Sequence, residues 1–110
     1  MAPKDDKTSV APRVSIIIPI YNEEAILHSA VVDLLDRLEE FDWPYELVLA
    51  ENGSKDRTVE VARELSERFR QVKYFSLGEP NYGKALRKAI LEARGEFVLC
   101  DEIDLCDTDF

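Results

Sequence analysis

Cysteine and histidine are almost missing from this sequence. It contains two cysteines, Cys100 and Cys106, and one histidine, His28. These residues form neither a Cys/His metal-binding pattern nor a disulfide framework, so we expect free thiols and a reducing compartment. A P-loop, a GxGxxG motif and a Ser-His-Asp pattern are absent as well. A P-loop NTPase and a standard dinucleotide-binding fold are therefore disfavoured.

Basic residues are also scarce, and no hydrophobic run is long. Lysine and arginine number 14 against 23 aspartates and glutamates, which gives a formal net charge of −9. This balance argues against nucleic acid and against a polybasic membrane-binding patch, because both depend on clustered Lys and Arg. Without an apolar leader or a membrane-length segment, we expect a cytoplasmic chain. An acidic protein that binds a diphosphate needs a cation to screen the charge.

Length and composition indicate one domain preceded by a tail. A chain of 110 residues with 45% hydrophobic residues has the size and composition of a single globular domain. Residues 1–12 include two prolines and are largely polar, which predicts a flexible N-terminal tail. The domain is expected to cover residues 13–110.

Four short apolar runs have the length and composition of β-strands. Val14–Ile20 (VSIIIPI) is almost entirely apolar, which suits a strand buried on both faces, and we expect its pairing to stop at Pro19. The other predicted strands are Tyr45–Ala50, Val72–Ser76 and Phe97–Cys100. Their separation by helix-length segments predicts an α/β fold with a mainly parallel sheet.

Helical periodicity fills the segments between these runs. The first helix is expected to start from an N-cap at Asn22 and to carry apolar residues from Ile26 to Phe41 on its inner face. The second is expected to follow a cap at Ser54 or Asp56. The third is predicted from Gly83 to Arg94, with Ile90 facing inward and Gly95 just past the end.

Polar segments lie where the predicted strands end or the next helices begin. In open parallel α/β sheets, ligands bind outside the carboxyl ends of the strands. Four segments are expected there, namely residues 19–23, 51–54, 81–84 and 101–104. We therefore expect these loops to converge on one rim of the molecule.

The last of these segments could hold a divalent cation. Glu102 and Asp104 flank a single residue, so in an extended segment both carboxylates point to the same side. Carboxylate oxygens suit Mg²⁺ or Mn²⁺, which also bridges substrate phosphates. The alternative is a solvated acidic tail, since the last ten residues include Asp101, Glu102, Asp104, Asp107 and Asp109.

Two further segments offer groups for a nucleotide. N-Y-G-K (residues 81–84) combines a helix start with a glycine and a lysine, which is a natural anion site. E-N-G-S (residues 51–54) offers a carboxylate and an amide to a base or ribose. A plain turn with a surface lysine, and a tight turn with a helix cap, are the respective alternatives.

Taken together, four segments resemble the family 2 glycosyltransferases with the GT-A fold, the group that includes the dolichol-phosphate mannose synthases. VSIIIPIYNEE (Val14–Glu24) is similar to the first strand and loop of that family, and ENGSKDRT (Glu51–Thr58) to its DDGSxDxT turn. N-Y-G-K (residues 81–84) resembles its N-x-G-K helix start. ARGEFVLCDEID (Ala93–Asp104) resembles the strand that leads to its DxD motif. Their order and spacing also match.

The resemblance implies the N-terminal nucleotide-binding half of a GT-A domain, three-layered (αβα), with strand order 3-2-1-4 and truncated after the fourth strand. Such a half binds a UDP- or GDP-sugar for transfer to an acceptor, either a lipid phosphate or a saccharide. The general base would lie beyond residue 110. A homodimer and membrane association of the full-length protein are compatible with the resemblance. The nucleotide-binding residues would be Pro19, Tyr21, Glu23, Glu51, Asn52, Lys84 and Glu102.

The same resemblance assigns the metal ligands. Glu102 and Asp104 would hold Mg²⁺ or Mn²⁺ in the position of the DxD motif. The sequence departs from the family in two places, because Glu51 and Glu102 stand where the family has aspartate. Asp101 could take the first role in the motif instead.

Two other hypotheses compete with a glycosyltransferase. A non-catalytic nucleotide-binding or interaction module would keep the fold without transfer, and the two Asp-to-Glu differences favour it. A sugar nucleotidyltransferase shares the α/β layout but would need a Gly-rich, basic loop after the first strand. Residues 21–24 are acidic there instead.

Overall fold

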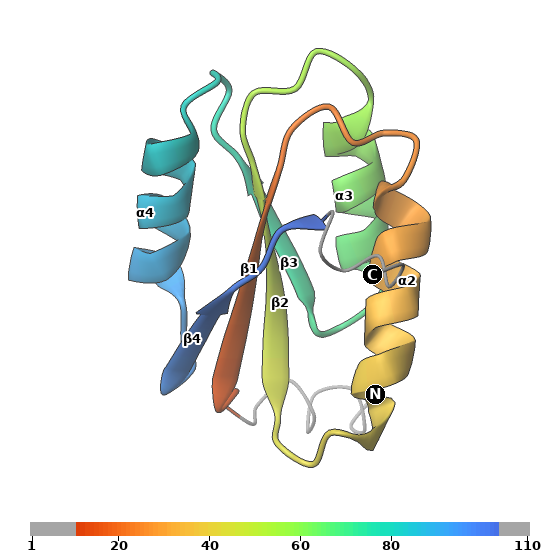
Figure 1. Ribbon diagram of the computed structural model, residues 1–110, viewed down its shortest axis with the longest axis vertical. Coiled ribbons are helices and arrows are strands. Elements are labelled where there is room, and N and C mark those ends of the chain that lie inside the picture. Colours follow the sequence, from red (N-terminus) through yellow and green to blue (C-terminus); the bar gives the residue numbers. More distant parts are fainter. Residues whose placement is uncertain (1–10, 104–110) are drawn as a thin grey trace.

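The computed structural model describes residues 11–103 of the chain. These residues contain four parallel strands and three α-helices, joined by loops and one 3₁₀ turn. The sheet has the strand order β3-β2-β1-β4. Helices α2 and α3 cover one face and α4 covers the other (Figure 1). The predicted αβα architecture and strand order are therefore confirmed. The elements are β1 (Val14–Ile20), α2 (Leu27–Arg37), a 3₁₀ turn η1 (Leu38–Glu40), β2 (Tyr45–Glu51), α3 (Thr58–Arg68), β3 (Val72–Ser76), α4 (Tyr82–Glu92) and β4 (Phe97–Cys100).

Strand β1 is the centre of the core because both of its faces are covered. All seven of its residues are buried. Ile16, Ile18 and Ile20 pack into the cluster under α2 and α3, whereas Ile17 packs with Ala85 and Ala89 of α4. Side chains of a strand alternate between its two faces, so an unbroken apolar run is what a doubly covered strand requires.

Pro19 does not end the pairing of β1, contrary to the sequence prediction. The ladder with β2 continues through Pro19 to Ile20, which lies opposite Glu51. The carbonyl of Ile17 accepts from Asp101 and that of Ile20 from Asn52, so alternate residues of β1 bond to opposite neighbours. Position 19 faces the β4 side, where pairing has already ended at Ile17. The missing N–H of proline therefore breaks no bond in the ladder.

The helices differ from the predicted patterns at their ends. Helix α2 begins after Ile26, and Asn22 is not its N-cap but lies in the left-handed region with φ 52°. Ile26 and Phe41 are exposed rather than inward, because Ile26 precedes α2 as its N-cap residue and Phe41 follows η1. Ile90 of α4 is also exposed, and only the small Ala85 and Ala89 are fully buried on that helix.

Gly95 serves a purpose other than the predicted helix cap. Helix α4 ends at Glu92 with Ala93 as its C-cap, and Gly95 has no positive φ. A Cβ at this position would lie 2.7 Å from the backbone nitrogen of Ser15. Gly95 also donates its N–H to Ser15 Oγ at 2.8 Å. The glycine therefore allows the start of β4 to lie directly against β1.

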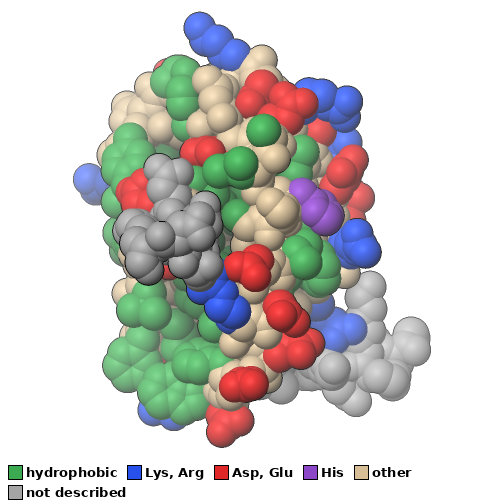
Figure 2. Space-filling model, turned by 45° about the vertical axis from the view of Figure 1, so that its right-hand side comes forward, with side chains coloured by type: hydrophobic (Ala, Val, Ile, Leu, Met, Phe, Trp, Pro, Cys, Tyr) green, Lys and Arg blue, Asp and Glu red, His purple; other side chains and the backbone are tan. Residues whose placement is uncertain are grey.

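Strand β4 forms an edge of the sheet and is the least covered element. All four of its residues are exposed, including Phe97, Val98 and Leu99. Figure 2 shows hydrophobic side chains gathered along the left-hand side of the molecule, on which β4 lies in Figure 1. Between residues 11 and 103, no helix has both the length and the apolar character needed to cross a bilayer.

Candidate functional site

The loops after β1 and β2 are joined by hydrogen bonds at the carboxyl edge of the sheet. The Asn22 N–H donates to Ser54 Oγ at 2.8 Å, and the Lys55 N–H donates back to Asn22 Oδ1 at 2.8 Å. The Glu23 N–H donates to Thr58 Oγ1 at 2.8 Å. Asparagine tolerates the left-handed conformation better than most residues, so it suits this turn. The backbone of Glu23 is thereby held against Thr58, the first residue of α3.

Glu51 is a fully buried carboxylate at the end of β2. It accepts hydrogen bonds from the Ser54 N–H and from Ser76 Oγ, the latter at 2.7 Å. Burial alone would raise the pKa of Glu51, but these hydrogen bonds outweigh it and hold the pKa below the ordinary value of 4.5. The carboxylate is therefore charged at neutral pH and connects the ends of β2 and β3.

The next two residues link β2 to the start of α4. Asn52 Oδ1 accepts from the Asn81 N–H at 2.6 Å, and Asn81 Oδ1 caps the helix by accepting from the Lys84 N–H at 3.0 Å. Gly53 has φ 75°, and a Cβ there would lie 2.4 Å from the backbone carbon of Glu79. The turn thus fits closely against the loop before α4, as the predicted convergence requires.

Tyr82 connects α4 to the segment after β4. Its hydroxyl donates to Glu102 Oε2 at 2.5 Å, and this hydrogen bond to a carboxylate raises the pKa of Tyr82. Tyr82 is not among the residues predicted from the sequence, because it stands at the variable position of N-x-G-K. Only its place beside Asn81 and Gly83 could have drawn attention to it, because nothing local relates residue 82 to residue 102.

The remaining predicted nucleotide-binding residues differ in exposure. Pro19 is buried within β1, whereas Tyr21 is exposed in the loop that follows. Lys84 Nζ forms an ion pair with Glu79 at 3.1 Å. The structure thus brings Glu23, Glu51, Asn52, Lys84 and Glu102 to the same rim as Tyr21.

The predicted metal ligands are only partly within the described residues. Asp104 lies outside them, and within residues 11–103 no group of three or more His, Cys, Asp or Glu side chains is placed to hold an ion. Glu102 is exposed, and Asp101 beside it accepts from the Glu102 N–H at 3.1 Å. Two carboxylates with hard oxygen donors fit Mg²⁺ or Mn²⁺ chemically, with further ligands to come from substrate phosphates or Asp104.

Comparison with known families gives a match over most of the chain. The model described as "Glycosyl transferase family 2" matches residues 15–108. A dolichyl-phosphate beta-glucosyltransferase of Trichomonas vaginalis is 39% identical over 101 residues, which cover 83% of this chain and 30% of that protein. The chain therefore spans less than a third of the length of this curated relative.

Solved structures show the same fold. A mannosyltransferase from Pyrobaculum calidifontis in complex with GDP-Man and Mn²⁺ superimposes with a TM-score of 0.66 at 28% identity, covering 88% of this chain and 29% of that one. Residues 1–349 of Staphylococcus aureus TarS in complex with UDP-GlcNAc give a TM-score of 0.64 at 30% identity, covering 84% and 26%.

Proposed function

This chain belongs to glycosyl transferase family 2, and we propose that it forms the donor-binding part of an enzyme that transfers a sugar from a nucleotide-diphosphate sugar to an acceptor. The observation that supports this most directly is the convergence of the four loops. Hydrogen bonds join Asn22 to Ser54, Asn52 to Asn81, and Tyr82 to Glu102. A nucleotide laid across this rim would meet backbone and side-chain groups from all four strand ends.

Within this proposal, the described residues have different tasks. Glu23 and Asn52 would face the base and ribose from the loops after β1 and β2, with Pro19 and Tyr21 forming the adjoining wall. Glu51 is fully buried, so its contribution would be to hold the turn in place through Ser54 and Ser76. Lys84 would leave Glu79 to meet a phosphate.

A divalent cation would be held by Glu102 together with Asp104, as Mg²⁺ or Mn²⁺. It would add to the positive charge of Lys84 at the diphosphate, in a chain whose formal net charge is −9. Tyr82 occupies Oε2 of Glu102, which would leave Oε1 for the ion or the ribose. The Mn²⁺ in the Pyrobaculum calidifontis structure supports this choice of ion.

We also propose a class of donor and a class of acceptor. The solved neighbours hold GDP-Man or UDP-GlcNAc, so both UDP- and GDP-sugars are candidates. A lipid phosphate is the first acceptor to test, because the relative from Trichomonas vaginalis acts on a dolichyl phosphate according to its name. We assign no residue of this chain to deprotonation of the acceptor hydroxyl, which transfer requires.

The test is thermal unfolding of the 110-residue chain with UDP or GDP, with and without Mn²⁺. A nucleotide present at 100 times its Kd should stabilise the fold by about 2.7 kcal/mol, which raises the Tm of a domain of this size by about 10 °C. We expect the rise to depend on Mn²⁺ and to be largely lost in Glu102→Gln. Glu64→Gln, an exposed carboxylate of α3, is the matched control and should keep the rise.

The same experiment separates the second candidate function, a non-catalytic interaction module. The burial of Glu51 favours that alternative. Glu51 stands in the position of the family's base-contacting aspartate, but its carboxylate is buried and already accepts a hydrogen bond from Ser76. If neither nucleotide changes the Tm at any Mn²⁺ concentration, the proposal that this chain binds a nucleotide-sugar donor is wrong. The non-catalytic interaction module is then favoured.

A further inference from the structure

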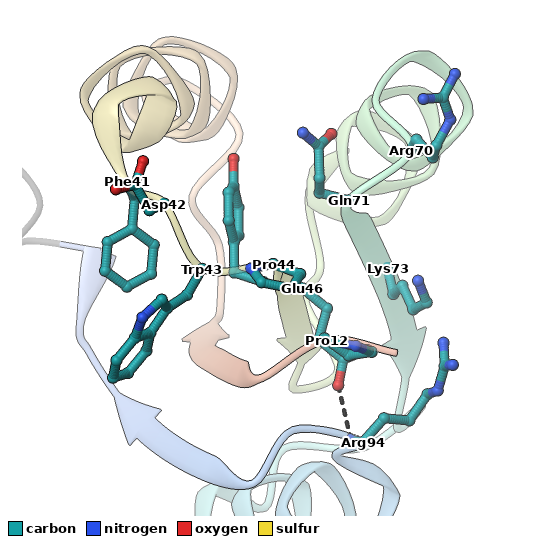
Figure 3. Close-up of a pocket in the computed structure, with 11 residues that line it drawn as sticks. Pro12, Phe41, Asp42, Trp43, Pro44, Glu46, Arg70, Gln71, Lys73 and Arg94 are labelled. Carbon is teal, nitrogen blue, oxygen red and sulfur yellow. Dashed lines mark hydrogen bonds between the residues drawn. The ribbon is translucent and has the colours of Figure 1, made fainter. Parts of the chain in front are cut away.

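A cavity lies at the opposite end of the sheet from the proposed nucleotide site. It has a volume of about 440 Å³ and is lined from the turn before β2, the amino ends of β2 and β3, and the segment before β4 (Figure 3). A seven-residue strand separates this end from the carboxyl rim, which corresponds to about 20 Å. A volume of this size is within the range of small-molecule sites. The cavity is therefore independent of the donor site.

One wall of the cavity is aromatic and held in a fixed arrangement. The ring of Trp43 stacks on Phe97 with centroids 5.9 Å apart and lies 5.9 Å from the ring of Phe41. The guanidinium of Arg13 lies 4.2 Å from the Trp43 ring centroid. A ring fixed by neighbours on several sides loses little entropy when a ligand packs against it. Trp43 nevertheless remains 41% exposed, so the wall is open to a ligand.

The other wall is cationic. Lys73 and Arg94 line the cavity and lie on the opposite side from Trp43 in Figure 3, whereas the side chain of Arg70 points away. Within residues 11–103, neither Lys73 nor Arg94 forms an ion pair. Two unneutralised cations beside one cavity are notable in a chain of net charge −9. They favour a negatively charged group at this wall.

Two carboxylates line the cavity: Asp42, which is exposed and lies beside Phe41, and Glu46, which is already engaged. Glu46 is only 3% exposed, and its Oε2 accepts from Ser15 Oγ at 2.6 Å and from the Arg94 N–H at 2.8 Å. The second bond is the dashed line in Figure 3. Glu46 therefore fixes the backbone of Arg94 at the cavity while its own charge is satisfied inside the protein. The accessible charge of the inner wall is that of Lys73 and Arg94.

We propose that this cavity is a second ligand site, which takes a small amphipathic anion: a phosphate or carboxylate carried on an aromatic or compact apolar body. The apolar body packs against Trp43, and the anionic group lies between Lys73 and Arg94. Each wall alone would be an ordinary surface feature, and it is their position across one cavity that specifies a ligand with two unlike ends.

Trp43 provides a direct test, because it is the only tryptophan of the chain. Its indole N–H therefore gives a single signal in a ¹H–¹⁵N correlation spectrum. Phenyl phosphate titrated into the 110-residue protein should shift this signal saturably. Benzyl alcohol, which has the ring without the charge, and inorganic phosphate, which has the charge without the ring, should each bind at least about tenfold more weakly.

Substitutions at Lys73 and Arg94 test whether these two side chains bind the anionic group. Lys73→Gln and Arg94→Gln should each weaken the binding of phenyl phosphate about threefold to tenfold, while the rest of the spectrum shows that the fold is intact. Arg63→Gln removes an exposed arginine from α3 and should leave the affinity unchanged. The proposal is overturned if phenyl phosphate does not move the Trp43 signal. It is also overturned if either half-ligand binds equally well, or if the two cavity variants bind like Arg63→Gln.

Discussion

At the scale of single residues, the Glu51 carboxylate connects three parts of the rim. It belongs to β2, and it accepts from Ser54 in the following turn and from Ser76 at the end of β3. Its hydrogen bonds hold its pKa below 4.5 in spite of burial. A carboxylate whose pKa is depressed in the folded state stabilises the fold above its unfolded pKa, and that stabilisation is lost as the pH falls through the folded pKa.

Glu51→Gln should therefore lower the free energy of unfolding at pH 7 by about 2 kcal/mol, because the neutral amide accepts fewer and weaker hydrogen bonds. The deficit relative to the wild type should shrink as the pH falls below about 4.5, because Glu51 is protonated in the unfolded wild-type chain first and in the folded protein only at lower pH. Urea unfolding at pH 7, 5, 4 and 3 measures this convergence. A deficit that stays constant over the whole range would contradict the charged role of Glu51.

At the scale of elements, the turn between β2 and α3 determines how closely two loops can approach. Gly53 needs its positive φ of 75°, and it also lies against the backbone of Glu79 and Pro80. Gly78 has a similar φ of 83°, but a Cβ there would meet nothing within 4 Å. The two glycines therefore share the conformational requirement, and only Gly53 has the steric one.

Gly53→Ala and Gly78→Ala separate these two contributions. Gly78→Ala should destabilise the protein by about 1 kcal/mol, the cost of a left-handed alanine. Gly53→Ala should cost about 3 kcal/mol or more, since the backbone of the neighbouring loop must move as well. The free energies of unfolding in urea report both effects. Equal losses in the two variants would show that the loops are not in firm contact.

At the scale of the whole molecule, the sheet is unequally covered. Strand β1 is buried on both faces, whereas β4 exposes every one of its residues, with Leu99 at 54% and Phe97 at 49%. An edge strand that combines unpaired backbone groups with exposed apolar side chains is a ready site for pairing with another chain. The homodimer compatible with the sequence resemblance would use this edge.

We expect the chain to self-associate through β4 at concentrations of about 100 μM. Sedimentation velocity should show a coefficient that rises with concentration for the wild type and stays at the monomer value for Leu99→Lys, because a charge opposes burial of the edge. Val32→Lys places the same charge on α2, at a residue that is 36% exposed, and should behave like the wild type. A wild type that remains monomeric over this range would contradict the prediction.

The sequence by itself determined the strands, their alternation with helices and the segments that meet at one rim. Burial on both faces requires an unbroken apolar run, and the run at residues 14–20 is visible without coordinates. Parallel strands end on the same edge, so the positions of residues 51–54 and 81–84 follow from the order of the elements. The predictions were less accurate near the ends of the helices. Ile26, Phe41 and Ile90 fit a helical period, but their side chains are exposed.

Only the tertiary structure decided which side chains meet. Tyr82 and Glu102 are 20 residues apart and Ser15 and Gly95 are 80 apart, and such pairs leave no local pattern in the chain. The burial of Glu51 and Glu46 likewise depends on partners from other elements. The cavity beside Trp43 is formed by segments that come together only when the sheet assembles. Local periodicity reports whether a residue is covered, but the identity of its neighbours depends on how the elements pack.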